Sequence, residues 1–280
     1  MYKSVSLMLI SSLLLSVAIL PGNANSANPL QLNNRTNSDT VSNFFGEKLI
    51  YDISFLWFKN AAVGSTILQR DEENYVAKLK AETKGFMGFI TGYIKHLYVS
   101  RMSMAGENSG LQPYLFEKNI IYQRSEKKTI TTLDYDNRIV SWFTTKMGKK
   151  IEEKSEPIPL SIVYYDILST LYNFRTRYYG EIQKGKDFLI HTIPEKNESE
   201  IHIHICTREE ELKLKKEENI EDREGYFLII KIPKEIFKTK HGEVLIWGSK
   251  DLLPLKIVVK DYIGFGDVRG TLREVVMADD

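Results

Sequence analysis

The sequence predicts a mainly β protein: a single, highly curved antiparallel sheet, or half-open β-barrel, with one central amphipathic helix packed in its concave side. Most segments after residue 44 alternate apolar and polar residues and are separated by short polar turns, which is typical of strands. Only one long segment, 157–179, has its apolar residues at helical spacing. Because no second helix is predicted, the apolar stripe of this helix has to be buried against the sheet.

The helix is expected at about 160–178. Pro157 and Pro159 stand just before it, where a missing amide proton does no harm, and Gly180 closes it. Its apolar residues recur in steps of three and four, which places them on one side of a helix. They are Leu160, Val163, Tyr164, Ile167, Leu168, Leu171, Phe174 and Tyr178.

The remaining segments read as strands of an antiparallel meander. The strands expected before the helix are 47–58, 61–70, 75–83, 95–105, 111–123, 127–135 and 139–145. Those expected after it are 187–193, 200–207, 211–215, 226–232, 243–247, 255–262 and 268–275. The run 208–224 is dense in Glu and Lys, and we interpret it as a solvated hairpin or edge, because mixed charges block edge pairing.

Residues 1–26 have the pattern of a secretory signal peptide. Lys3 precedes an apolar run, Pro21 and Gly22 break it, and small residues follow. The alternative is an uncleaved membrane anchor, but the apolar run is short for a span of about 20 residues. We therefore expect a signal peptide at 1–26, a flexible lead-in at 27–43 and a single β domain at 44–277, with no transmembrane span after cleavage. Cys206 is the only cysteine, and this thiol-poor exported chain fits the periplasm of a Gram-negative bacterium.

The charge of the chain is balanced. It has 38 basic and 37 acidic residues, and removal of Lys3 with the signal peptide makes the two equal. A neutral total argues against nucleic acid as a partner and gives no bulk attraction to anionic lipid. Partners are expected to be recognised by shape and apolar surface.

The segment 84–93, KGFMGFITGY, interleaves three glycines with apolar residues. It could form a short helix or a loop, and one interpretation is a short piece of core folded over one end of the sheet. The other is a mobile flap over a ligand cavity, where glycines supply backbone freedom. The second interpretation gives six candidate ligand-binding residues, three from this segment and three from the predicted helix: Phe86, Phe89, Tyr93, Tyr164, Leu168 and Tyr172.

Three sequence motifs resemble the DUF3108 family of exported bacterial proteins of unknown function. The first is the opening strand Phe45-Gly46-Glu47 with Leu49 and Tyr51, and the second is the helix 166–172 (DILSTLY) with Arg175. The third comprises Ile246, Trp247, Asp251, Pro254, Gly264 and Leu272. The resemblance implies an envelope protein with a strongly curved antiparallel sheet and supplies no catalytic residues. The outline is similar to that of periplasmic lipoprotein carriers, which is an analogy of fold alone.

The best metal candidates are His202 and His204, which share one face of a predicted strand with Cys206. A catalytic zinc site needs three protein ligands and a structural one needs four. Cys206 lies roughly 13 Å along the strand from His202, at about 3.3 Å per residue, which is far for a shared ion. We therefore predict no metal and no cofactor, and a polar strand face at these positions.

Asp166 and Ser169 lie three residues apart on the predicted helix. A nucleophilic Ser169 would need a base and an oxyanion hole, and no G-x-S-x-G elbow exists in the sequence. We predict structural roles instead: Asp166 caps the helix, bonds a strand backbone or pairs with an arginine such as Arg175. Trp247 is expected in the core, with Asp251 shaping a nearby hairpin.

These observations favour a non-catalytic protein of the periplasm or cell envelope that binds or carries an apolar or amphipathic, lipid-like molecule. One alternative is a structural interaction module that docks onto an envelope protein through an exposed sheet edge. Another is a metal-dependent hydrolase that uses His202 and His204.

Overall fold

The computed structural model describes residues 41–55, 58–104, 109–195, 198–221, 223–231, 240–262 and 266–277. The predicted signal peptide and the lead-in up to residue 40 lie outside the described residues. The N-terminal half of the sheet consists of β1 (Glu47–Phe55), β2 (Phe58–Asp71), β3 (Asn74–Thr83), β4 (Lys95–Ser103), β5 (Gln112–Tyr122), β6 (Ser125–Asp134), β7 (Ile139–Lys146) and β8 (Lys149–Pro157). The C-terminal half consists of β9 (Asp187–Glu195), β10 (Glu198–Ile205), β11 (Tyr226–Lys231), β12 (Glu243–Gly248), β13 (Pro254–Tyr262) and β14 (Gly266–Met277).

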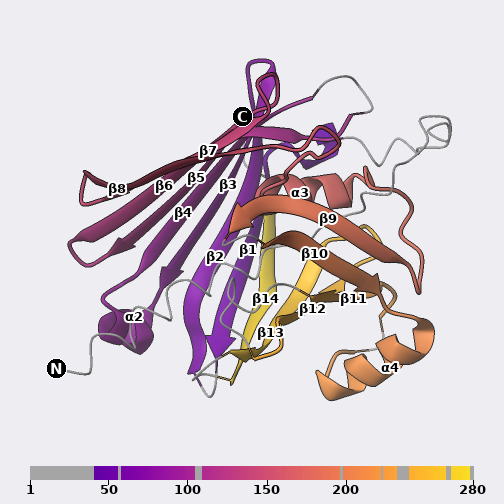
Figure 1. Ribbon diagram of the computed structural model, residues 1–280. Coiled ribbons are helices and arrows are strands. Elements are labelled where there is room, and N and C mark those ends of the chain that lie inside the picture. The colour runs from indigo at the N-terminus through magenta and orange to yellow at the C-terminus, as the bar shows by residue number, and fades with distance from the viewer. Residues whose placement is uncertain are drawn as a thin grey trace.

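These fourteen antiparallel strands of the described chain form one open sheet. Its order is β8-β7-β6-β5-β4-β3-β2-β1-β14-β13-β12-β11-β10-β9, so the two halves meet where β1 pairs with β14. Burial alternates along the strands, as in β1, because one face of the sheet packs on the core. Figure 1 shows the two halves bending around the helix α3 (Ile167–Arg175). The predicted fold class, mainly β with a curved, half-open antiparallel sheet, is confirmed.

The central helix is shorter than predicted, with bounds Ile167–Arg175 in place of about 160–178. Its start is set by Asp166, whose buried carboxylate accepts hydrogen bonds from the amides of Leu168 and Ser169. The residues before it run along the sheet, where Tyr165 bridges to Thr192 of β9. The prediction that Leu160 belongs to the buried stripe is wrong, since 90% of this residue is exposed.

Two further α-helices lie in the described chain, and one of them replaces a predicted strand. One is α2 (Gly85–Thr91), in the segment for which a flap or a folded-over piece was considered. The other is α4 (Arg208–Glu217), where the sequence predicted a strand at 211–215 inside a charged hairpin or edge. This segment forms a helix instead of a strand because Thr207 and Glu210 form a capping box. In addition, acidic residues occupy the first turn, and Lys215 and Lys216 lie in the last turn. A short 3₁₀ helix, Val41–Phe44, begins three residues before the expected domain start.

Apolar residues gather on both faces of the C-terminal half. The main core lies on the inner face and includes Leu168, Leu171 and Phe174 of α3. A second cluster lies on the outer face beneath α4 and consists of Cys206, Phe227, Leu245, Trp247 and Val258. This half of the sheet is therefore covered on both sides.

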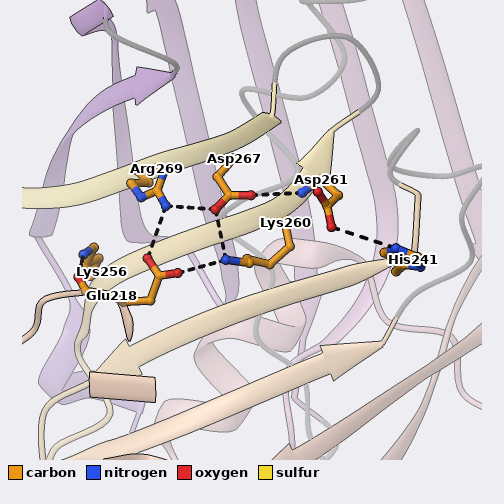
Figure 2. A network of polar contacts seen from close by, with 7 residues as sticks. All are labelled: Glu218, His241, Lys256, Lys260, Asp261, Asp267 and Arg269. Atoms are coloured by element: carbon orange, nitrogen blue, oxygen red, sulfur yellow. Dashed lines mark hydrogen bonds and ion pairs between the residues drawn. The ribbon is translucent and has the colours of Figure 1, made fainter. Parts of the chain in front are cut away.

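A network of charges fastens the end of α4 to the outer face of β13 and β14 (Figure 2). The buried carboxylate of Glu218 accepts from Lys260 at 3.0 Å and from Arg269 at 3.4 Å. Both cations also donate to Asp267, at 3.0 and 2.8 Å. Two carboxylates and two cations compensate one another, so the network is a structural clamp.

None of the helices in the described part of the chain is long and apolar enough to cross a membrane.

Candidate functional site

The three predicted ligand-binding residues from the central helix region lie in the main core. Leu168 and Tyr172 have no exposed surface, and Tyr164 is 6% exposed. The Tyr172 side chain packs near Phe44, with 6.4 Å between ring centroids. These three residues therefore lie apart from the exposed Phe86, Phe89 and Tyr93, and the structure does not bring the six candidates together.

Asp166 and Arg175 hold the two ends of α3 to the sheet. Besides capping the helix, the Asp166 carboxylate accepts a 2.6 Å hydrogen bond from Ser100 of β4. Arg175 does not pair with Asp166; it forms a bidentate ion pair with Glu47 of β1, and its guanidinium lies over the Phe44 ring. Both side chains thus position the helix.

Asn173, which the sequence analysis did not single out, adds a third attachment of α3. Its side-chain oxygen accepts from the backbone amide of Leu111 at 2.6 Å, and its side-chain nitrogen donates to the Leu111 carbonyl at 2.9 Å. A buried amide that satisfies both groups of one backbone residue orders the segment before β5.

Trp247 is buried in the outer cluster, where the ammonium of Lys215 lies 4.1 Å from its ring centroid. Asp251 lies in the turn between β12 and β13, and its amide donates to the Ser249 hydroxyl. Both residues occupy structural positions.

The two histidines of β10 have different surroundings. His204 is bound on both ring nitrogens, to Asp187 and to Glu210, each at 2.9 Å. Burial would lower the pKa of His204, but the hydrogen bonds to Glu210 and Asp187 outweigh it and raise that pKa. His202 is exposed beside it. The described residues include no group of three or more His, Cys, Asp or Glu that could hold a metal ion.

The helix α2 lies at one end of the N-terminal half and presents two different sides. Met87 and Thr91 are buried toward the inner face, where the Thr91 hydroxyl lies 2.9 Å from that of Thr83 in β3. The other side carries Phe86 (63% exposed), Phe89 (76%), Ile90 (38%) and Tyr93 (51%). The spacing 86, 89 and 90 places the first three side chains on one exposed side of the helix, and Tyr93, which follows the C-cap, lies with its ring against Gly88.

A glycine lies at each end of this helix. Gly85 and Gly92 have φ angles of +53° and +71°, which side chains with a Cβ adopt only with strain. The first turn therefore leaves β3 sharply, and the C-cap turns the chain back into β4. This geometry lets α2 fold over the end of the sheet, which is the first of the two interpretations of this segment.

The inner face beside α2 carries small and polar side chains. In register across β2 to β6 lie Gly64, Ala81, His96, Ile120 and Lys127. The next row along the strands holds Thr66, Leu79, Tyr98, Lys118 and Thr129.

His96 is the unusual group on this face. It is 2% exposed, and neither ring nitrogen has a hydrogen-bond partner among the described residues. Its ring contacts that of Tyr98 edge-on, with centroids 6.1 Å apart, and Tyr98 in turn contacts Phe116. Burial lowers the pKa of His96 to about 3, so the imidazole is neutral near pH 7. Buried polar groups nearly always have a partner, and this one has none in the described protein.

Lys118 lies one row away from His96 on the same face and is half-buried. Burial lowers its pKa to about 8, and the neighbouring charge of Lys127 contributes to the same shift. The inner face of β4–β6 thus carries an aromatic floor, formed by the rings of Tyr98 and Phe116, together with the neutral imidazole of His96 and two lysines. Such a surface suits an apolar molecule with a polar or anionic end.

His96 and Lys118 were missed by the sequence analysis because the strands gave no sign of which face is inner. In β4 the alternation sets His96 and Tyr98 against Leu97 and Val99, and both sets contain apolar side chains. Only the register with β3 and β5 assigns His96 to the inner face.

Fold and site together define an open, curved antiparallel sheet that encloses a helix and carries an apolar cap at one end. The chain belongs to the family described as "Protein of unknown function (DUF3108)", which matches residues 50–273. The predicted family is confirmed. No curated protein sequence matches the chain. Among solved structures, it is similar to the crystal structure of a beta-barrel-like protein of domain of unknown function DUF1849 from Brucella abortus, with 9% identity and a TM-score of 0.47 over 83% of this chain and 98% of that chain.

Proposed function

We propose that the protein is a non-catalytic binding protein, or carrier, for an amphipathic, lipid-like molecule, and that α2 covers the bound molecule on the inner face of β3–β6. In this proposal the protein acts in the periplasm, to which the signal-peptide pattern of residues 1–26 directs it. The apolar part of the ligand lies along Tyr98, Phe116 and Ile120. Its polar end lies near His96 and Lys118.

The observation that carries the proposal is the orphaned imidazole of His96. A buried hydrogen-bonding group without a partner costs about 1–3 kcal/mol. An apolar side chain of similar size at this position would avoid that cost. The site is therefore not optimised for the stability of the empty protein, which supports a partner that arrives from outside.

The edge-docking alternative has no observation in its favour. Strand β8, at one end of the sheet, has the sequence KKIEEKSEP, and its charges discourage pairing with another strand. Beside β9, at the other end, the Tyr165 carbonyl accepts a hydrogen bond from the amide of Ile193, and the Tyr165 amide donates to the carbonyl of His191. Both ends thus carry features that protect a sheet edge.

The replacement His96→Leu tests the role of the imidazole. Ligand-free protein should become about 1 kcal/mol more stable, because an unsatisfied polar group is removed. Binding of a fluorescent fatty-acyl probe such as dansyl-undecanoic acid should weaken by about fivefold or more, because its polar end loses a partner. The same change on the outer face, His191→Leu, is the matched control and should leave probe binding unchanged. Wild-type protein that rejects the probe after delipidation would rule out the proposal.

A disulfide tests whether α2 has to move. The hydroxyl oxygens of Thr83 and Thr91 are 2.9 Å apart, so Thr83→Cys with Thr91→Cys places two thiols within reach. Burial raises the pKa of the Cys206 thiol to about 12, which keeps the native cysteine unreactive. The oxidised variant should take up the probe much more slowly than the reduced one.

The matched control for the disulfide is Ser141→Cys with Ser155→Cys. These hydroxyls are 2.8 Å apart on β7 and β8, away from α2, and a disulfide there should not alter uptake. Equal uptake rates by the oxidised and reduced Thr83/Thr91 variant, with the bond verified by mass spectrometry, would refute the covering role of α2.

A further inference from the structure

The exposed stripe of α2 stands at the end of the sheet without a covering segment among the described residues. Phe86, Phe89, Ile90 and Tyr93 expose between 38% and 76% of their surfaces. Phe86 is anchored by stacking on Phe58 of β2, with ring centroids 6.0 Å apart. A fixed cluster of exposed aromatic side chains on a short helix marks an interaction surface.

Basic and acidic residues are segregated to opposite ends of the strands in the N-terminal half, although the charges of the whole chain nearly cancel. The end that carries α2 also carries the turns β5–β6 and β7–β8, whereas the turns β2–β3 and β6–β7 lie at the opposite end (Figure 1). Exposed basic residues occupy the α2 end: Lys59, Lys84, Arg124, Lys127, Lys146, Lys149 and Lys150. Exposed acidic residues occupy the turns of the opposite end: Asp71, Glu72, Glu73, Asp134 and Asp136. Opposite charges are fewer at both ends: Glu126, Glu152 and Glu153, which pairs with Lys150, at the α2 end, and Arg70 at the other.

Two of these lysines flank the aromatic stripe directly. Lys84 is the N-cap residue of α2, and Lys59 is the second residue of β2, next to Phe58. Neither has an ion-pair partner among the described residues, whereas Lys95 is paired with Glu82. The C-cap glycine of α2 packs on Gln123, which brings the β5–β6 turn and Arg124 to the other end of the helix. From residue 83 to residue 97 the chain contains no acidic side chain.

We infer that this end of the molecule docks onto a lipid bilayer that carries anionic headgroups. Phe side chains enter the boundary between headgroups and acyl chains, Tyr remains at headgroup level, and flanking lysines pair with phosphates. The charge pattern selects this partner, because the acidic opposite end would be repelled by the same surface. The inference goes beyond the proposed function, because docking depends on the outer side of α2 and ligand binding on the face beneath it.

Vesicle co-sedimentation tests the docking. We expect wild-type protein to bind vesicles of phosphatidylcholine and phosphatidylglycerol (3:1) and to bind pure phosphatidylcholine about tenfold more weakly or less. Phe86→Ser with Phe89→Ser should reduce binding by about tenfold or more, because the bilayer loses the two aromatic rings that enter it. Lys59→Glu with Lys84→Glu should abolish the preference for the anionic vesicles.

The matched control is Leu160→Ser with Leu212→Ser, which removes two exposed apolar side chains elsewhere on the surface (90% and 46% exposed). It should bind vesicles like the wild type. A second readout is Phe89→Trp, which introduces an indole whose fluorescence should shift to the blue on anionic vesicles and be quenched by brominated acyl chains. Thermal unfolding verifies that each variant is folded.

Three results would overturn the inference: no binding of wild-type protein to the anionic vesicles, equal binding by the Phe86/Phe89 variant, or unchanged emission of the tryptophan introduced by Phe89→Trp. The fatty-acyl probe separates this inference from the proposed function. Loss of vesicle binding with probe binding intact in the Phe86/Phe89 variant supports docking through α2. Vesicle binding by a protein that rejects the probe supports docking and refutes the carrier.

Discussion

The two halves of the sheet share one continuous strand pairing but present different inner faces. In the C-terminal half the inner face is aliphatic and closely covered, with Ile203, Ile230 and Ile246 all at most 1% exposed. In the N-terminal half, the rows of β3–β6 beside α2 mix small and polar residues such as Ala81 and Lys118 with apolar and aromatic residues such as Leu79 and Tyr98. The C-terminal half is covered on both faces, by the main core and by α4, whereas the inner face of the N-terminal half contacts α3 at β3 and β4 and carries α2 at one end.

The difference indicates a division of labour within one domain. A sheet buried on both faces gains most of its stability from apolar burial, which makes the C-terminal half the scaffold. The N-terminal half retains His96 without a partner and exposes an aromatic helix, both of which cost stability or solubility. Features of that kind persist where a surface has a use, and the following predictions test whether the division is real.

The largest effect is expected at the junction of the two halves. Arg175 of α3 and Glu47 of β1 have side chains that are 3% and 14% exposed. Arg175→Met leaves a carboxylate largely buried without its partner and should cost about 3–5 kcal/mol of unfolding free energy in urea titrations. The exposed pair Arg273–Asp52, 2.9 Å apart, is the control, and Arg273→Met should cost less than about 1 kcal/mol. Similar small losses in both variants would contradict the role of the junction.

Truncation of one isoleucine in each half compares the scaffold with the binding face directly. Ile203→Ala removes a side chain that is 1% exposed in the C-terminal half and should cost about 2–5 kcal/mol. Ile120→Ala acts on a half-buried side chain of the N-terminal inner face and should cost clearly less, about 1 kcal/mol. Equal losses would show that both halves are packed alike and would remove the basis of the comparison.

The scaffold could be predicted from the sequence more fully than the binding face. The period-two alternation and the single helical stripe were enough for an open antiparallel sheet around a helix, because both patterns follow from burial on one side. The helix boundary was missed because the capping residue Asp166 is held in place by a hydrogen bond from Ser100, a contact between residues 66 positions apart. The strand predicted at 211–215 failed because a local capping box at Thr207 and Glu210 outweighed the reading of charged residues as an edge.

The binding face depends on register, which local patterns do not supply. His96, Lys118 and the aromatic floor come together only through pairing of β4 with β5. The aromatic segment 84–93 was visible in the sequence, yet its division into a buried and an exposed side needed the helix α2. The charge segregation was likewise hidden, because it requires knowing which turns share an end of the sheet.

The acid response of His96 is expected to be intermediate in size. Its folded pKa is about 3, and an unfolded histidine has a pKa of about 6.5. The unfolded chain therefore binds the extra proton between these values, so stability falls as pH decreases from about 6.5, by up to about 1.4 kcal/mol per pH unit from this residue. His96→Leu should remove this part of the decline. Between pH 8 and pH 5 the wild type should lose about 2 kcal/mol more unfolding free energy than the variant. If urea unfolding shows the same loss of unfolding free energy in both proteins between pH 8 and pH 5, the buried neutral imidazole is contradicted.

The smallest effect is expected at His204 in the C-terminal half. Its contribution to stability depends on pH with the opposite sign to that of His96. Its pKa is raised in the folded protein by the hydrogen bonds to Glu210 and Asp187, which prevail over burial. Its contribution is therefore fully present below the unfolded pKa of about 6.5 and is lost as pH rises through the folded value. His204→Gln should cost at most about 1 kcal/mol at pH 5.5 and less at pH 8.5, while His202→Gln on the exposed side of β10 changes neither. An NMR titration that places the His204 pKa at or below 6.5 would contradict this assignment.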